Sequence, residues 1–302
     1  MDTRADVVRA IVRFELPALG PASIRPLGGG QQHVAYEVDG RFVVRLGIDG
    51  DDDCAARVER EVALLDVVER ISPLAVPQPL FVVPERCCYG YHLLSGVPLQ
   101  ELAPEARAQL VPRVAPAIGE FLAALHAMPV AELAALAPSD LQPPSEWLRD
   151  AAELYAAVAA HMPAPSEDAA VRAFLETPPP ATSDEPVFSH NDLGIEHILV
   201  NPEGGGVTGV IDWSDAAICD RAYDFGLLLR DLGPAALDAA FTGYTVDPDV
   251  PAITERAWFY ARCAAIEDLA YGLETGRDEY MTKSRDALPW LFAPGDGIPA
   301  QR

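Results

Sequence analysis

The sequence is almost without lysine. Lys283 is the only one among 302 residues, so every other basic side chain is arginine or histidine. The formal net charge is −24, whereas nucleic acid and anionic membrane surfaces demand a basic face from the proteins that bind them. The composition therefore argues against both partners. It fits a cationic substrate drawn in by a negative field, although acids that only keep a protein dispersed would give the same charge.

Long apolar runs and paired cysteine motifs are also missing. No apolar run approaches the ~20 residues of a membrane-spanning helix, and residues 1–6 are too polar to begin a signal peptide. The cysteines are five in number, without Cys-x-x-Cys spacing: Cys54, Cys87, Cys88, Cys219 and Cys263. We expect reduced thiols, no zinc site and a cytoplasmic protein.

Hydrophobic periodicity divides the chain into two parts. Short β-type runs occur at residues 23–27, 34–38, 41–46, 80–83 and 88–94, with amphipathic helices at 2–16 and 52–69. Beyond a glycine- and proline-marked stretch the pattern is helical from residue 104 onward, with an apolar stripe at 114–128. Further helices are expected at 145–161, 166–175, 220–232, 253–274 and 278–291. We predict an α+β fold with a five-stranded antiparallel N-terminal lobe (1–94), a hinge (95–99) and a helical C-terminal lobe (100–302).

The most informative stretch covers residues 188–213. Two apolar runs, 198–200 and 207–211, flank a glycine-rich turn and predict a hairpin. That hairpin would bring together Asp192, His197 and Asp212, which is the residue set of a phosphoryl-transfer loop. We predict Asp192 as the general base, and Asp212 and His197 as the groups that hold Mg²⁺.

Two nearby polar residues are assigned supporting roles. His190 is expected to hydrogen-bond near Asp212 and hold the loop. Asp224, in the triplet Asp-Phe-Gly, begins an apolar helix, so we expect it to brace the catalytic loop and not to bind metal.

The N-terminal lobe carries candidate phosphate-binding groups. The run Gly28, Gly29 and Gly30 between two strands predicts a flap whose backbone N–H groups approach phosphates, although such a run is also common in plain turns. Arg45 stands where a kinase strand has lysine, and Glu61 lies on the following helix as its partner. A surface arginine and a solvated glutamate are the alternative.

The remaining predictions concern the two ligands. A cleft between the lobes is the default nucleotide site, with backbone groups of residues 92–94, represented by His92 and Leu94, facing a purine and Tyr91 behind it. The acids that we expect to bind ammonium groups of the substrate are Glu267, Asp268, Glu274 and Asp278. A solvated acidic face is the alternative for them.

The sequence resembles the aminoglycoside and macrolide phosphotransferase family over about residues 24–291, most closely in residues 189–200 and 209–215. The resemblance implies a protein-kinase-like two-lobed fold, ATP or GTP as donor and Mg²⁺. His197 replaces the usual asparagine, as in the 2″-aminoglycoside and macrolide subgroups. The arginine at position 45 resembles the residue that macrolide enzymes have there. The bulky residue at position 91, Tyr91, resembles the members of the family that use GTP.

Several alternatives remain open at this point. A metal-dependent hydrolase could instead use four of these side chains as metal ligands, and it would need neither flap nor hinge. The four are His190, Asp192, His197 and Asp212. A nucleotide-binding protein without transfer activity and a kinase of an amino alcohol are two others. A protein kinase fits poorly, because only eleven residues separate Asp212 from Asp224, too few for an activation segment that holds a peptide.

Overall fold

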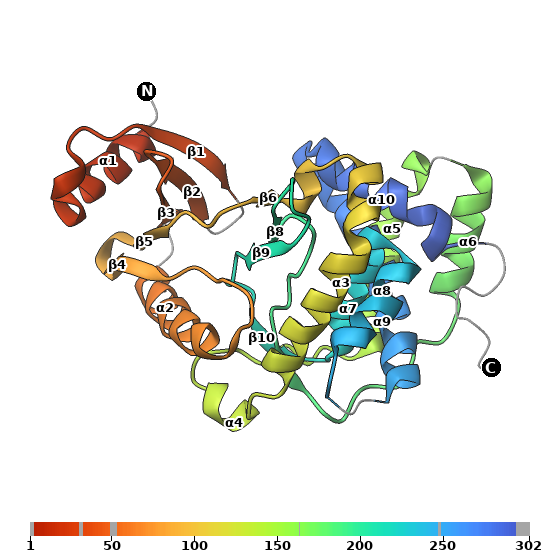
Figure 1. Ribbon diagram of the computed structural model, residues 1–302. Coiled ribbons are helices and arrows are strands. Elements are labelled where there is room, and N and C mark those ends of the chain that lie inside the picture. The colour runs from red at the N-terminus through yellow and green to blue at the C-terminus, as the bar shows by residue number, and fades with distance from the viewer. Residues whose placement is uncertain (1–2, 30–32, 49–52, 163, 247–248, 294–302) are drawn as a thin grey trace. The chain divides into compact units, whose positions relative to one another are not determined.

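A computed structural model describes residues 3–29, 33–48, 53–162, 164–246 and 249–293 (Figure 1). The chain divides into two compact units. The first contains residues 1–96 and 208–214, and the second contains residues 97–207 and 215–302. Each unit is described by itself.

The first unit is built on a five-stranded antiparallel sheet in the order β1-β2-β3-β5-β4. Its strands are β1 (Ile24–Gly29), β2 (His33–Val38), β3 (Phe42–Gly47), β4 (Pro79–Val83) and β5 (Cys88–His92). Asp39 and Gly40, both with positive φ, form the tight turn between β2 and β3, as the Asp-Gly pair predicts. The predicted α+β fold, with a small antiparallel sheet and a mostly helical remainder, is confirmed.

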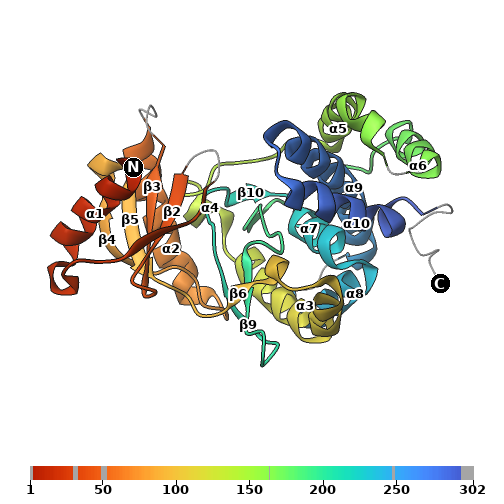
Figure 2. The ribbon, with the colours of Figure 1, turned by 90° about the horizontal axis from the view of Figure 1, so that it is seen from above.

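One helix packs against each face of this sheet (Figure 2). From α1 (Thr3–Glu15), Val8 and Val12 join Val44 and Phe81 in one core. On α2 (Cys54–Ile71), the buried stripe includes Leu65 and Val68. Successive side chains of β3 point to opposite faces of the sheet, and both faces are covered by a helix. The strand is therefore buried on both faces, which explains its almost continuous apolar run.

Residues 208–214 belong to the first unit although they are distant from it in sequence. The Val210 N–H donates to the Ala75 carbonyl at 2.9 Å, and the Thr208 hydroxyl donates to the Ser95 carbonyl at 2.6 Å. Gly209 fits because a Cβ there would lie only 2.9 Å from the Ala75 oxygen. These contacts fix the position of Asp212 within the first unit.

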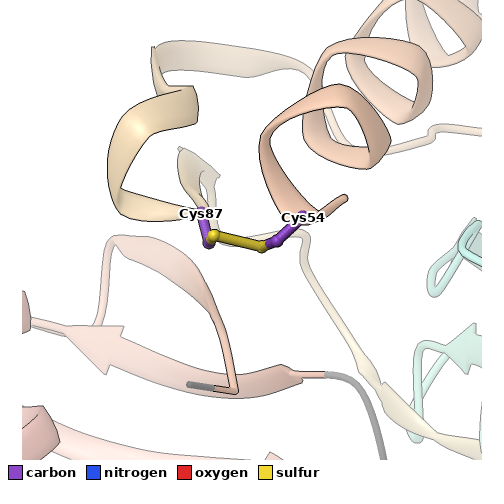
Figure 3. Close-up of a disulfide and its surroundings, with 2 residues drawn as sticks. All are labelled: Cys54 and Cys87. Carbon is purple, nitrogen blue, oxygen red and sulfur yellow. A yellow bond between two sulfur atoms is a disulfide. The ribbon is translucent and has the colours of Figure 1, made fainter. Parts of the chain in front are cut away.

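A disulfide joins Cys54, the first residue of α2, to Cys87, which follows the 3₁₀ turn η2 (Pro84–Arg86) (Figure 3). The expectation of reduced thiols is therefore wrong for this pair. The two Cα atoms are 5.5 Å apart although the residues are 33 positions apart in sequence. Spacing arguments miss such a bridge because the sheet, and not the local sequence, brings the two residues together.

Reduction of this disulfide is expected to destabilise the protein. Opening a loop of this size should lower the free energy of unfolding by about 2–4 kcal/mol, since the unfolded chain regains conformational freedom. Urea unfolding with and without dithiothreitol measures the change. The double variant C54S/C87S should not respond to the reductant, and an equal response would place the effect elsewhere.

The second unit is mostly helical, and its helices α3, α7, α8 and α9 lie side by side (Figures 1 and 2). The helices are α3 (Pro104–His126), α4 (Val130–Leu133), α5 (Pro144–Val158), α6 (Pro165–Leu175), α7 (Ala222–Leu232), α8 (Pro234–Gly243), α9 (Val250–Thr275) and α10 (Asp278–Leu291). Gly119 and Gly243 let the backbones of α3 and α8 touch, since a Cβ on either would overlap a carbonyl of the other helix.

Short strands hold the loops of this unit. β7 (Val187–Ser189) pairs with β10 (Ala217–Cys219), and β6 (Val97–Pro98) pairs with β8 (Ile198–Val200). The strand β9 (Val207–Val210) follows in sequence, and the remaining 3₁₀ turns are η1 (Pro17–Leu19), η3 (Leu99–Glu101) and η4 (Ala159–His161). In the described parts of the chain no helix is long and apolar enough to cross a bilayer.

Helical structure begins where the pattern predicts. α3 starts at Pro104, contains the apolar stripe expected from Val114, and runs through Pro112 and Pro116. The helix α8 and the paired strands β7 and β10 were not predicted. They are short, and their apolar residues follow no clear period.

Candidate functional site

A buried arginine lies at the centre of the first unit's polar site. Arg45 is 6% exposed, and its Nη1 contacts the Glu61 carboxylate at 2.5 Å and the Tyr89 hydroxyl at 3.0 Å. Its Nη2 lies 2.9 Å from the ring nitrogens of His33 and 3.2 Å from Asp212 Oδ1. Arg45 thus joins β3, α2, β5 and the segment 208–214, and the surface alternative is excluded.

The charge on this arginine is strongly stabilised. Burial alone would lower the pKa of Arg45, but Tyr89, Glu61 and Asp212 outweigh it and hold that pKa above its ordinary value. This charge is shared with the Glu61 and Asp212 carboxylates, and its contact with phosphate stays a prediction.

Asp212 is held in an unusual backbone conformation. Its φ is 64°, a left-handed value that only a few non-glycine residues adopt. The Asp212 carboxylate accepts from the Ser214 hydroxyl at 2.9 Å, and 27% of its side chain remains exposed. Backbone strain of this kind occurs often at functional sites, because the surrounding contacts must impose it.

The glycine flap is only partly described. Gly28 and Gly29 belong to the end of β1 and pair with Ala35 and Val34, so the strand continues past its predicted end at Leu27. Gly30 lies outside the described residues. Neither described glycine has positive φ, so at these two positions any special value of glycine lies in the missing side chain.

The predicted purine-facing residues lie at the end of β5. Tyr91 is buried beside Tyr89, with ring centroids 5.9 Å apart, and burial raises the pKa of its hydroxyl. His92 is exposed at the strand end, where it pairs with Phe42, and Leu94 is half-buried beside Gly209. All three belong to the first unit.

In the second unit, Asp192 and His197 are brought together by a tight loop. His197 Nδ1 donates to the Asp192 carbonyl at 2.7 Å and lies 3.4 Å from the Asp192 carboxylate. The Asp192 side chain is 42% exposed, so it can reach a substrate. The preceding residue, Asn191, has a φ of 63°, the second strained position in the two predicted site stretches. The meeting of these residues with Asp212 stays a prediction.

Asp224 lies beneath this loop. Its Oδ2 accepts the backbone N–H groups of His190 at 3.0 Å and Asn191 at 3.3 Å, and both Asp224 and His190 are fully buried. Burial raises the pKa of the Asp224 carboxyl to about 6, while the backbone donors act against that rise. The contact therefore holds the turn that precedes Asp192.

Titration of Asp224 is expected to affect stability and activity in opposite directions. Between about pH 4 and pH 6 the Asp224 carboxyl is protonated in the folded protein and ionised in the unfolded protein. The bound proton contributes about 2–3 kcal/mol to the free energy of unfolding at low pH, and this contribution is lost as the pH rises through 6. Activity should rise over the same range, because the ionised carboxylate accepts the loop N–H groups more strongly.

This expectation can be checked by urea unfolding and kcat measured from pH 4 to 8. In D224N both pH effects near 6 should disappear. The control variant D238N, which replaces an exposed carboxyl on α8, should keep them. Identical profiles for D224N and the wild type would assign the titration to another group.

The four predicted substrate acids do not form one site. The Asp268 carboxylate forms ion pairs with Arg230 and with Lys283, each at 3.0 Å. These contacts correct the assignment of Asp268 as a substrate ligand. Glu274 and Asp278 are exposed near the turn between α9 and α10. Glu267 reaches solvent, but surrounding protein desolvates its carboxyl and, with Asp268, raises its pKa.

The second unit contains instead a cavity of about 340 Å³ next to the Asp192 loop. Its walls are acidic and aromatic: Asp140, Leu141, Gln142, Trp147, Thr182, Ser183, Asp184, Pro186, Asn191, Cys219, Asp220, Tyr223 and Tyr260. The rings of Trp147, Tyr223 and Tyr260 contact one another at centroid distances of 5.2–5.8 Å. Burial raises the pKa of the Tyr223 hydroxyl, and so do the carboxylates of Glu267 and Asp192.

Charge in this cavity is unevenly balanced. Asp220 is paired with Arg256 at 2.7 Å. Among the residues that the structure describes, Asp140 forms no ion pair, and its carboxylate accepts from the uncharged Asn191 amide at 3.1 Å. Aromatic faces and a carboxylate together suit a substrate that carries an ammonium group on a partly apolar body.

Sequence reasoning missed several of these residues. Tyr89 stands two positions before Tyr91 on the same strand face, so the period of two could have indicated it. Trp147 and Tyr260 are brought to the cavity by α5 and α9, and no local pattern connects them. Asp140 lies in the loop before α5, where nothing in the sequence marks it.

The residues of each unit fit the ligands that the sequence implies. Asp212 offers hard carboxylate oxygens, which Mg²⁺ prefers, beside a guanidinium that suits phosphate. Because His197 Nδ1 donates to a carbonyl, its Nε2 carries the lone pair that a metal or a water would take in the neutral ring.

Comparisons with known proteins agree on the fold. The GDP complex of aminoglycoside 2′-phosphotransferase-IIIa superposes with a TM-score of 0.73 at 21% identity, over 96% of this chain and 99% of that one. A GDP and kanamycin complex of an APH(2″) enzyme gives 0.70 at 21% identity, over 94% and 98%. Macrolide 2′-phosphotransferase MphH from Brachybacterium faecium gives 0.62 at 22%, over 96% and 99%.

A search of curated proteins finds no match. The sequence model of the phosphotransferase enzyme family, however, matches residues 23–259, which is most of the chain. The chain belongs to the phosphotransferase enzyme family.

Proposed function

We propose that this protein is a nucleotide-dependent O-phosphotransferase that moves the γ-phosphoryl group of ATP or GTP to a hydroxyl of a small cationic antibiotic, with an aminoglycoside as the first candidate. The observation that carries the proposal is the strained, braced loop at Asp192 beside an acidic and aromatic cavity. Family membership and the kanamycin and GDP complexes of similar folds support it.

Asp192 acts as the general base in this proposal. Its carboxylate accepts the proton of the acceptor hydroxyl while that oxygen forms its bond to the γ-phosphorus and the bond to the β–γ bridging oxygen breaks. His197 keeps the loop closed on the Asp192 carbonyl, and Asp224, with buried His190, holds the preceding turn.

The first unit binds the donor. Arg45, with Glu61 as its partner, binds the phosphates, and the run of Gly28, Gly29 and Gly30 covers them. The purine lies against residues 92–94 with Tyr91 behind. Asp212 and His197 hold Mg²⁺, which would supply neutralisation of the phosphate charge.

The substrate site is the cavity beside Asn191, and not the acid cluster at the end of α9. Asp140 and Asp184 supply its negative charge, and Glu267 lies close to Tyr223. The aromatic wall also favours a second candidate function, because a macrolide amino sugar or an amino alcohol metabolite has a single ammonium beside apolar carbon. The similarity in fold to macrolide 2′-phosphotransferase MphH from Brachybacterium faecium also supports the macrolide as a candidate.

A panel assay tests the function. The full chain is incubated with Mg²⁺ and either ATP or GTP, together with aminoglycosides, macrolides and amino alcohols, and products are identified by the mass of one added phosphoryl group. Transfer to one acceptor class supports the proposal and selects among the candidates. Nucleotide binding without transfer to any of them would favour a non-catalytic nucleotide-binding protein.

The proposal includes a cytoplasmic location, where ATP and GTP are available. In that compartment cellular thiols could reduce the bridge between Cys54 and Cys87.

A further inference from the structure

The only lysine of the chain is buried in the second unit. Lys283 on α10 is 4% exposed, and its Nζ lies 2.8 Å from Glu196, 3.0 Å from Asp268 and 4.0 Å from Asp231. Arg230 on α7 completes the cluster through Asp231 at 2.7 Å and Asp268 at 3.0 Å. Two cations and three carboxylates thus meet in one buried network.

This network is attached to the loop that carries Asp192 and His197. Glu196 directly precedes His197, and the Asp231 carboxylate accepts the Ile195 N–H at 3.0 Å. Gly194 leaves the space into which Glu196 folds back, because a Cβ there would lie within 3 Å of the Glu196 carboxylate. Three consecutive loop residues are therefore adapted to the network.

The charges make Lys283 the group on which Glu196 depends. Glu196 is largely buried, with 14% of its side chain exposed, and Lys283 Nζ donates to its carboxylate at 2.8 Å. Arg230 is held by Asp231 and Asp268, so Lys283 is the cation in direct contact with Glu196. Removing the lysine would leave a carboxylate buried without its partner.

We propose that Lys283 is a positioning residue for phosphoryl transfer: through Glu196 it fixes the loop from Gly194 to His197 and so the orientation of the Asp192 carboxylate. Lys283 touches neither reacting group. The role rests on the proposed function with Asp192 as base, whereas the fixing of the loop does not depend on activity.

The test compares K283M, E196Q and the double variant with the wild type, with R172M as control. Arg172 forms an ion pair with Asp168 on α6 and lies over the Tyr155 ring, and none of these residues belongs to the Lys283 network, so its loss removes a cation without breaking a contact of that network. Hydrogen–deuterium exchange of the peptide that contains the Ile195 amide is measured for each protein. Steady-state kinetics with the best acceptor of the panel follow.

We expect at least tenfold faster exchange at Ile195 and at least tenfold lower kcat in K283M and in E196Q, with the KM for nucleotide within twofold of wild type. Because both side chains act through one contact, the double variant should lose no more than the worse single variant. R172M should match the wild type.

Two results would overturn the role. One is wild-type exchange and kcat in E196Q, which keeps the side-chain shape and is the deciding variant if K283M does not fold. The other is a product of the two single losses in the double variant, which indicates independent packing effects. If no acceptor is phosphorylated by the wild type, the proposed function fails, and the exchange data still decide whether Lys283 fixes the loop.

Discussion

Replacing Asp192 with alanine is expected to lower kcat by about 10²–10⁴-fold while nucleotide still binds. The acceptor hydroxyl keeps its proton until late in the transfer unless a carboxylate lies within hydrogen-bond reach of it. Asp192 is the partly exposed carboxylate of the loop, and the His197 ring and the turn above Asp224 hold the backbone around it. Donor binding depends on the first unit, so the change should fall on kcat.

The measurement is initial rate at saturating donor and acceptor, together with calorimetric titration of Mg-nucleotide. D192N is the matched variant, since it keeps the shape and removes the base, and D238A controls for the loss of one surface carboxylate. Turnover within threefold of wild type in D192N would remove Asp192 from the mechanism. Loss of nucleotide binding in either Asp192 variant would mean that the residue has a structural role beyond its unit.

The sheet and its polar centre were predictable because their signals are local. Asp39-Gly40 specifies a tight hairpin turn, and period-two alternation places Arg45 and Tyr89 on the face of the sheet that meets α2. Glu61 is on the buried stripe of that helix. The ion pair between Arg45 and Glu61 therefore follows from pattern and from family resemblance together.

The substrate acids were less predictable for a reason that the helix itself supplies. Glu267 and Asp268 are neighbours on α9, and neighbouring helical residues point about 100° apart, so the two side chains start out towards different surroundings. Asp268 turns towards Arg230 and Lys283. Lys283 in turn begins a buried stripe with Ala287 and Leu291 at helical spacing, a signal that was present in the sequence.

Other features depend on contacts between distant parts of the chain. Cys54 meets Cys87 through the sheet, and Val210 joins the first unit through Ala75. The cavity is assembled from α5, α7, α9, the end of β10 and loops at 140–142, 182–186 and 191. Composition and spacing contain no record of such pairings, so the sequence could not indicate the disulfide or the cavity.

Replacing Arg45 with methionine is expected to be the most damaging change in the first unit. The variant leaves the Glu61 carboxylate buried beside the Tyr89 hydroxyl without a cation, and breaking a buried pair from one side costs about 3–5 kcal/mol of unfolding free energy. It also removes the group that we assign to the phosphates. Urea unfolding and the KM for nucleotide measure the two effects.

The double variant R45M/E61L separates stability from function. With both charges replaced by apolar groups of similar size, part of the lost free energy of unfolding should return, because no carboxylate remains buried at position 61. The rest stays lost, since the buried Tyr89 hydroxyl and the Asp212 carboxylate no longer have their partners. Nucleotide binding should stay as weak as in R45M, since the phosphates still lack their cation. R45K should recover part of the binding, because an ammonium keeps the charge. It cannot replace the two guanidinium nitrogens, of which Nη1 contacts Glu61 and Tyr89 and Nη2 contacts Asp212. Wild-type affinity for nucleotide in R45M/E61L would show that Arg45 serves only the core of the sheet, and the phosphate site would then have to be sought elsewhere in the unit.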